Sequence, residues 1–156
     1  MMRYILSVAL VALLLSACKK DKFTTVPQIS FKSFSPNTWY ANSTVKPGPM
    51  MNIKLTDLEG DFGFNVGKDT SYVYVKNLTI PPYNVDSLEF PVLSSTNLGK
   101  NLDVTVSFDL QSGRGILQGT GIAHRTDTLY FEVYVKDFAK NKSNVVKSDP
   151  FYLVNP

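Results

Sequence analysis

Three acidic side chains alternate along one short segment of the sequence, at Asp57, Glu59 and Asp61. Gly60 and Gly63 permit a tight backbone there, so the three carboxylates are expected close together on a turn. Hard oxygen ligands on a short loop are what Ca²⁺ prefers. The alternative is that these side chains cap their own turn by accepting hydrogen bonds from its backbone.

The acidic segment does not have the pattern of an EF-hand. Such a loop, counted from Asp57, would need Gly at its sixth position and Glu at its twelfth, and this chain has Phe62 and Lys68 there. If this segment binds calcium, we therefore expect a site of another type than an EF-hand.

Exposed aromatic side chains are the second candidate for a functional surface. Trp39 and Tyr40 are adjacent in a predicted loop, and aromatic platforms of this kind stack on sugars or anchor protein interfaces. Tyrosines also alternate along two predicted strands, at Tyr72, Tyr74, Tyr130 and Tyr134. For these tyrosines, packing across neighbouring strands is the favoured alternative.

The N-terminal segment has the layout of a secretory signal. Arg3 precedes an apolar run of about 11 residues from Ile5 to Leu15, too short for the ~20 residues that a membrane-spanning helix needs. The run ends in Leu-Ser-Ala-Cys, which resembles the lipobox of bacterial lipoproteins, and Cys18 is the only cysteine in the chain. That resemblance implies an acylated Cys18 that anchors the protein in a membrane. The alternative is an ordinary signal peptide with Cys18 as a free thiol.

Composition excludes several other classes of function. The 156 residues carry a formal net charge of +3 with no stripe of Lys and Arg, so no nucleic-acid partner is expected. One cysteine and one histidine leave no disulfide framework and no His-rich or Cys-based metal site. No nucleophile elbow and no glycine-rich phosphate loop is present. We therefore expect no enzyme and no catalytic residues.

The elements that must position these residues are short strands. Apolar and polar residues alternate with period two at 102–110 and 129–135, and shorter alternating runs occur at 29–31, 51–55, 73–75 and 151–153. Less regular strands are expected at 88–93 and 115–122. Glycine and proline turns separate the runs. The pattern predicts an all-β fold, an antiparallel immunoglobulin-like β-sandwich of about seven to nine strands.

A second polar segment, Asp137-Phe-Ala-Lys-Asn-Lys-Ser-Asn144, precedes the last predicted strand. Together with the acidic turn and Cys18, it resembles a family of small secreted Gram-negative lipoproteins with an immunoglobulin-like or cadherin-like sandwich. In that family a D-x-D/E-G-D-x-G turn follows an early strand and a D-x-A-x-N-x-S-N turn precedes the last one. The resemblance implies that Asp137 and Asn141 join the residues of the first turn in a calcium site.

Three segments and a function follow from these features. We expect a lipoprotein signal peptide at 1–17, an acylated Cys18 with a polar tether at 18–26, and one β-sandwich domain at 27–156. Lys19 after the cysteine, by the same resemblance, favours the outer membrane, on its periplasmic or surface-exposed face. The expected function is a non-catalytic binding module of the cell envelope with a protein or glycan ligand. The alternatives are a structural spacer of an envelope complex and, less favoured, a small glycan-acting hydrolase.

Overall fold

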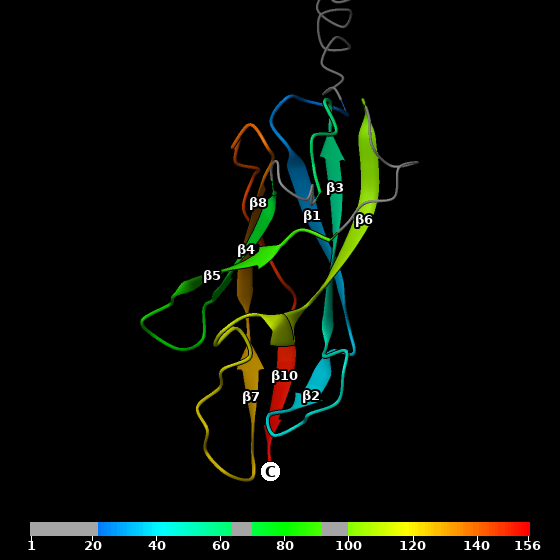
Figure 1. Ribbon diagram of the computed structural model, residues 1–156. Coiled ribbons are helices and arrows are strands. Elements are labelled where there is room, and N and C mark those ends of the chain that lie inside the picture. Colours follow the sequence, from blue (N-terminus) through cyan, green and yellow to red (C-terminus); the bar gives the residue numbers. More distant parts are fainter. Residues whose placement is uncertain (1–21, 64–69, 92–99) are drawn as a thin grey trace, which may run out of the picture.

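The computed structural model describes residues 22–63, 70–91 and 100–156, so the expected signal peptide and Cys18 lie outside the described residues. The described chain is all-β, with one short 3₁₀ turn, η2, at Leu110–Ser112 (Figure 1). Its ten strands are β1 (Gln28–Ser35), β2 (Thr38–Tyr40), β3 (Met50–Asp57), β4 (Tyr72–Asn77), β5 (Val85–Glu89), β6 (Leu102–Asp109), β7 (Arg125–Leu129), β8 (Phe131–Lys136), β9 (Val146–Lys147) and β10 (Phe151–Asn155).

The strands form three sheets that make two layers. One layer is β1-β3-β6, and the other contains β5-β4-β8-β9 and β2-β10-β7. The two sheets of the second layer are continuous, because β7 runs on into β8 through Tyr130 alone and Ser148 N donates to Phe131 O at 2.9 Å. Neighbouring strands pair antiparallel except β2 and β10, which are parallel. The described residues therefore confirm the predicted antiparallel sandwich.

Alternation of apolar and polar residues decides which side of each strand is buried. Along β3 the side chains of Met51, Ile53 and Leu55 are fully buried, and the residues between them are half-buried. The same alternation in β4 and β8 places Val73 and Val133 inside. Successive side chains of a strand point to opposite faces, so the period-two runs of the sequence give the core directly.

Aromatic side chains join the two layers. Phe34 of β1 lies edge-on to Phe131 of β8 and Phe151 of β10, with ring centroids 5.9 Å and 5.1 Å apart. Phe131 and Phe151 are themselves fully buried. Burying one such side chain contributes about 1.5–3 kcal/mol relative to leaving it in water, so this contact is a main link between the layers.

Three sequence-based expectations on strands were wrong. The segment 115–122 is a loop, because Gly115 and Gly121 adopt positive φ values of 78° and 70° that break a ladder. The run 129–135 belongs to two strands, which pair with different partners on either side of Tyr130. The described residues form ten strands where about seven to nine were expected, and the two shortest, β2 and β9, have too few residues to show a period.

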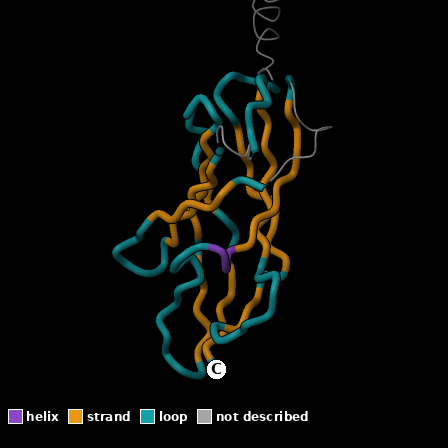
Figure 2. The backbone as a smooth tube through the Cα atoms, in the orientation of Figure 1, coloured by secondary structure: helices purple, strands orange, loops and turns teal. Residues whose placement is uncertain are grey.

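The two ends of the sandwich carry different loops (Figure 2). The chain enters at the end where β1 begins and β3 and β8 finish, whereas the C-terminus lies at the opposite end beside β2 and β7 (Figure 1). Within the described part of the chain, no helix has the length and apolar character needed to cross a bilayer.

Candidate functional site

Three aspartates from two separate turns converge at the end where the chain enters. Asp57 is the last residue of β3, Asp61 lies in the turn that follows, and Asp137 comes directly after β8. One carboxylate oxygen from each lies within 4.8 Å of the others. Asp57 and Asp137 are buried, at 0% and 1% exposure, and Asp61 is half-buried. The fold thus brings together residues that are 80 positions apart in the sequence, as a group that could hold a metal ion.

The turn after β3 uses only one oxygen of Asp57. Asp57 Oδ2 accepts a hydrogen bond from Gly60 N at 2.7 Å, and Gly60 has a φ of 67°, which glycine adopts without strain. Asp57 Oδ1 is buried and accepts no hydrogen bond from the described residues. Because a buried carboxylate oxygen without a partner is costly, this oxygen is positioned to bind a proton, a water molecule or a cation.

The second turn docks on the first through its backbone. Asp61 O accepts a hydrogen bond from Phe138 N at 3.0 Å, and Asp61 Oδ2 lies 3.4 Å from Ala139 N. Asp137 is fixed by Asn141, whose backbone N donates to Asp137 Oδ1 at 2.7 Å and whose Nδ2 donates to Asp137 Oδ2 at 2.8 Å. The carboxylates are therefore held in place by the turns that carry them.

The electrostatics of the group are those of crowded negative charge. Burial raises the pKa of Asp57 to about 6; the hydrogen bond from Gly60 opposes this shift, and the charges of Asp61, Glu59 and Asp137 add to it. Burial also raises the pKa of Asp61, and the negative charge of Asp137 raises it further. A divalent cation bound between the carboxylates would stabilise their charged forms and so lower the pKa of both Asp57 and Asp61. Two oxygens bound to one Ca²⁺ at 2.3–2.6 Å lie at most about 5 Å apart, which the separation of these carboxylates satisfies.

Glu59 and Asn141 have other places in the structure. The side chain of Glu59 is exposed and lies outside the group, although its charge contributes to the raised pKa of Asp57. Asn141 is exposed, and its amide donates to Asp137, so it orients a carboxylate of the group.

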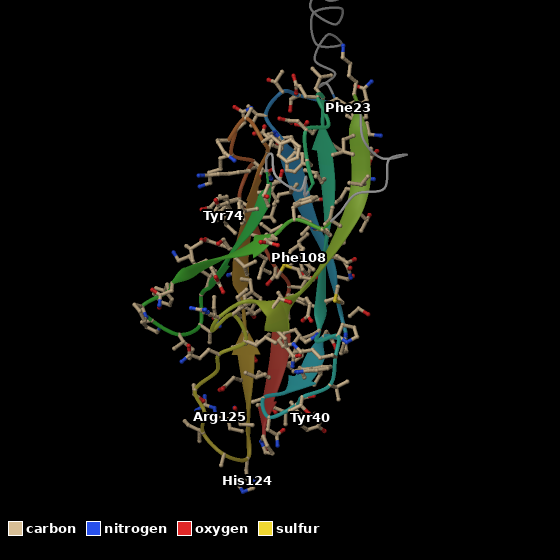
Figure 3. All side chains as sticks on the ribbon, viewed as in Figure 1. Phe23, Tyr40, Tyr74, Phe108, His124 and Arg125 are labelled. Atoms are coloured by element: carbon tan, nitrogen blue, oxygen red, sulfur yellow. The ribbon has the colours of Figure 1, made fainter. Side chains whose placement is uncertain are left out.

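The tether expected at 18–26 is attached to the sandwich over its described part. Lys22 Nζ lies 2.6 Å from Asp103 Oδ2, and Lys54 pairs with the same carboxylate. Leu58 N donates to Thr24 O at 3.1 Å, so the acidic turn is bonded directly to the incoming chain. Phe23 lies at this end in Figure 3. The contacts begin four positions after Cys18.

Trp39 and Tyr40 lie at the opposite end and do not form the expected platform. They belong to strand β2 and not to a loop, and Tyr40 is 59% exposed while Trp39 is half-buried against the core. Adjacent residues of a strand point to opposite faces, so their rings cannot lie side by side. Figure 3 shows Tyr40 and His124 at the same end of the sandwich, far from the entering chain.

Residues that the sequence reasoning missed include Asn144. Its side chain bonds Ile29 of β1 twice, and Ser143 beside it accepts a hydrogen bond from Val135 N at 3.0 Å. Both belong to the segment 137–144 that the sequence singled out, so the signal was present, but spacing alone did not show what the final asparagine contacts. The favoured alternative for the tyrosines is confirmed at Tyr74 and Tyr134, which stack across β4 and β8.

Comparison of the chain with protein-family models, with curated proteins and with solved structures gives no match. The class that the structure itself defines is a β-sandwich with a three-aspartate group at the end where its N-terminal segment enters.

Proposed function

We propose that this chain is a non-catalytic binding module of the bacterial outer membrane, anchored by a lipid on Cys18 and stabilised by Ca²⁺ at the anchored end of its sandwich. The observation that carries the proposal is the position of the Asp57, Asp61 and Asp137 group. Leu58, which follows Asp57, is hydrogen-bonded to Thr24 of the expected tether. The lipobox at Cys18 supports the anchor, and the class of ligand is taken up in the next subsection.

Calcium explains a feature that turn capping leaves unexplained. Capping accounts for Asp57 Oδ2 and for both oxygens of Asp137, each of which keeps a second lone pair. It does not account for Asp57 Oδ1, which is buried and has no hydrogen-bond partner among the residues that the structure describes. An ion bound between the three carboxylates would bond this atom and neutralise the repulsion that raises the pKa of Asp57.

A bound cation would also close the anchored end of the fold. The turn at 57–61 belongs to the β1-β3-β6 layer, and Asp137 follows β8 of the other layer. An ion shared between them would therefore tie the two layers together, close to where the tether is bonded at Thr24. Such a link would hold the two layers together at the end where the N-terminal segment is bonded to the sandwich.

Calorimetric titration of CaCl₂ into the mature chain, after treatment with EDTA, tests the calcium site. We expect heat of binding and a raised Tm with Ca²⁺, and a smaller effect with Mg²⁺, which demands a near-octahedral site. At a calcium concentration a hundredfold above the Kd, the stabilisation is about 2.7 kcal/mol, or roughly 8 °C for a domain of this size. No heat and no Tm shift at millimolar calcium would refute the site.

Asp57→Asn separates binding from folding. The amide is isosteric and uncharged, so we expect the variant to be at least as stable as the parent in EDTA while losing the calcium response. Asp149→Asn removes an exposed carboxylate elsewhere and is the matched control. A calcium response that survives in Asp57→Asn would contradict the assignment.

Cys18→Ala tests the anchor. The parent chain should incorporate labelled fatty acid and fractionate with membranes, because several acyl chains on one cysteine hold a protein at a bilayer. The variant should do neither. If neither form incorporates fatty acid, the lipoprotein part of the proposal is wrong.

A further inference from the structure

The outer side of the β5-β4-β8-β9 sheet carries stacked tyrosines covered by lysines. The rings of Tyr74 and Tyr134 stack with centroids 4.7 Å apart and planes 6° from parallel. Lys136 Nζ lies 5.3 Å from the Tyr74 centroid, and Lys142 Nζ lies 4.1 Å from that of Tyr134. Figure 3 shows Tyr74 on the side of the molecule turned away from β1, β3 and β6. Each cation–π contact contributes about 0.5–1 kcal/mol at an exposed site.

Strand register arranges this surface in three rows. The first row is Lys76, Glu132 and Lys147, the second is the Tyr74–Tyr134 pair, and the third is Tyr72, Lys136 and Lys142. The outer rows are four residues apart along the strands, about 13 Å at the rise of a β-strand. Lysines therefore lie on both sides of the stacked tyrosines, and we call this surface the Lys–Tyr face.

The Lys–Tyr face keeps a net positive charge within the described chain, because its four lysines outnumber the two carboxylates of Glu132 and Glu89 on the same side. None of its four lysines lies within 4.0 Å of a carboxylate among the residues that the structure describes. By strand register, the carboxylates of Glu132 and of Glu89, which pairs with Tyr72, belong to the same rows. Two of the lysines are also exposed, Lys142 and Lys147, and Lys147 Nζ lies 4.7 Å from the centroid of the Tyr130 ring. Because rings already hold these ammonium groups in place, less side-chain entropy is lost when an anion binds.

We infer that the Lys–Tyr face binds an anionic polysaccharide. This inference rests on the proposed binding role and names the class of ligand. Carboxylate or sulfate groups repeated along such a chain complement two separated rows of lysines, and sugar hydroxyls can bond the tyrosine hydroxyls between the rows. The surface spreads over three strands, which suits an extended polymer.

The arrangement of the rings disfavours two other polyanions. Single-stranded nucleic acid binds by stacking its bases on free aromatic faces, and here the faces of Tyr74 and Tyr134 are covered by each other and by lysines. An anionic membrane would meet the end of the sandwich where the N-terminal segment enters, whereas strands β4 and β8, which carry much of the Lys–Tyr face, lie along the side of the molecule (Figure 1).

Dextran sulfate and neutral dextran test the inference, because the two polymers share a backbone and differ in charge. Binding to the mature chain is measured in EDTA at low salt and again at 0.5 M NaCl. We expect binding to dextran sulfate alone, weakened at least tenfold by the salt. Because calcium is absent and no membrane is used, the result is independent of the tests for the calcium site and the anchor.

Variants locate the binding to this face. Lys136→Gln, Lys142→Gln and Lys147→Gln combined should weaken binding at least tenfold, and the corresponding triple Arg variant should retain it. The control removes the same charge from exposed lysines elsewhere, with Lys32→Gln, Lys46→Gln and Lys100→Gln, and should change affinity less than twofold. A single cooperative thermal transition shows that each variant is folded.

Three outcomes would overturn the inference. One is no binding of the parent chain to dextran sulfate at low salt. Another is an equal loss of affinity in the two Gln triples, which would show attraction by net charge alone. The third is tighter binding to a single-stranded oligonucleotide or to phosphatidylglycerol vesicles than to dextran sulfate.

Discussion

The side chain of Asn144 bonds both backbone groups of Ile29, as the backbone of a neighbouring strand would. Ile29 N donates to Asn144 Oδ1 at 2.7 Å, and Asn144 Nδ2 donates to Ile29 O at 2.9 Å, across 115 positions of sequence. An amide side chain carries one acceptor and one donor group, as a peptide unit does. It therefore satisfies the outer edge of β1 and connects the layer of β1 to the segment that leads into β9.

Asn144→Ala should lower the free energy of unfolding by about 1–2 kcal/mol, because two hydrogen bonds are lost and the backbone groups of Ile29 are left to water. Chemical denaturation of the parent and the variant measures the difference. Asn42→Ala, at an exposed position in the loop after β2, is the control and should change little. Equal stability of Asn144→Ala and the parent would show that water replaces the amide without cost.

Because the pKa of Asp57 is raised, its contribution to stability should decrease with rising pH, and bound calcium should reverse this trend. In EDTA the folded state holds a proton on Asp57 up to about pH 6, whereas the unfolded chain loses it near pH 4. Folded chains then bind more protons than unfolded ones between these values, so the contribution of Asp57 to stability falls as the pH rises from 4 to 6.

Calcium competes with that proton, so the stabilisation by Ca²⁺ should grow as the pH rises through 6. Thermal unfolding from pH 4 to pH 7, with and without 5 mM CaCl₂, measures both trends. Asp57→Asn should remove the difference between the two series, and Asp149→Asn should keep it. A calcium effect that is the same at pH 4.5 and pH 7 would argue against a site on Asp57.

Asp127 organises the loops at the far end of the sandwich, and acid should loosen them. Burial would raise the pKa of Asp127, but hydrogen bonds from Thr120 and Asn155 outweigh it and lower this pKa below its ordinary value. The stabilisation by Asp127 is thus complete above about pH 4, the unfolded value, and is lost as the pH falls through the folded value.

Asp127→Asn should cost about 1.5–3 kcal/mol at pH 7, since its amide nitrogen cannot accept the hydrogen bonds that the carboxylate oxygens receive. Denaturation at pH 7 and pH 3 compares the two chains. The difference between parent and variant should shrink at the lower pH. A difference that stays constant down to pH 2 would mean that the ionised carboxylate is not what stabilises the loop.

Glycine is required at position 119 because neighbouring side chains leave no room for a Cβ, and not because of a left-handed backbone conformation. A Cβ at this position would overlap Asp127 Oδ2 and would lie 3.1 Å from Leu153 Cδ2. Gly119→Ala should therefore destabilise the chain by about 1–3 kcal/mol, the range for overpacking at a filled site. Gln118→Ala next to it is the control, and thermal unfolding is the measurement. A variant as stable as the parent would show that the loop at 115–122 shifts freely.

The strands of the core could be predicted from the sequence because one face of each is buried and the other is wet. Met51, Ile53 and Leu55 show this alternation, and all three are buried. The loop at 115–122 could not be predicted, since its apolar residues contact the core from irregular backbone that Asp127 and Asn77 hold by hydrogen bonds. Such contacts join residues distant in sequence, which local periodicity does not report.

The acidic site could be predicted in part for the same reason. The carboxylates of Asp57 and Asp61 are neighbours in sequence, and spacing alone indicates a shared turn. That Asp137 completes the group depends on the two layers meeting at one end of the sandwich. That Glu59 points to solvent depends on the path of the turn around Gly60.

The two hydrogen bonds between the Asn144 side chain and Ile29 also affect how the molecule bears mechanical load. A pull on the N-terminal segment first meets the contacts of Lys22 and Thr24 and then acts along β1 from Gln28. The hydrogen bonds of β1 to β3 and to Asn144 lie across that direction. They are loaded together in shear and do not open one after another as in a zipper. A pull between the N-terminal segment and the far end of the sandwich is thus resisted at β1 by several hydrogen bonds at once.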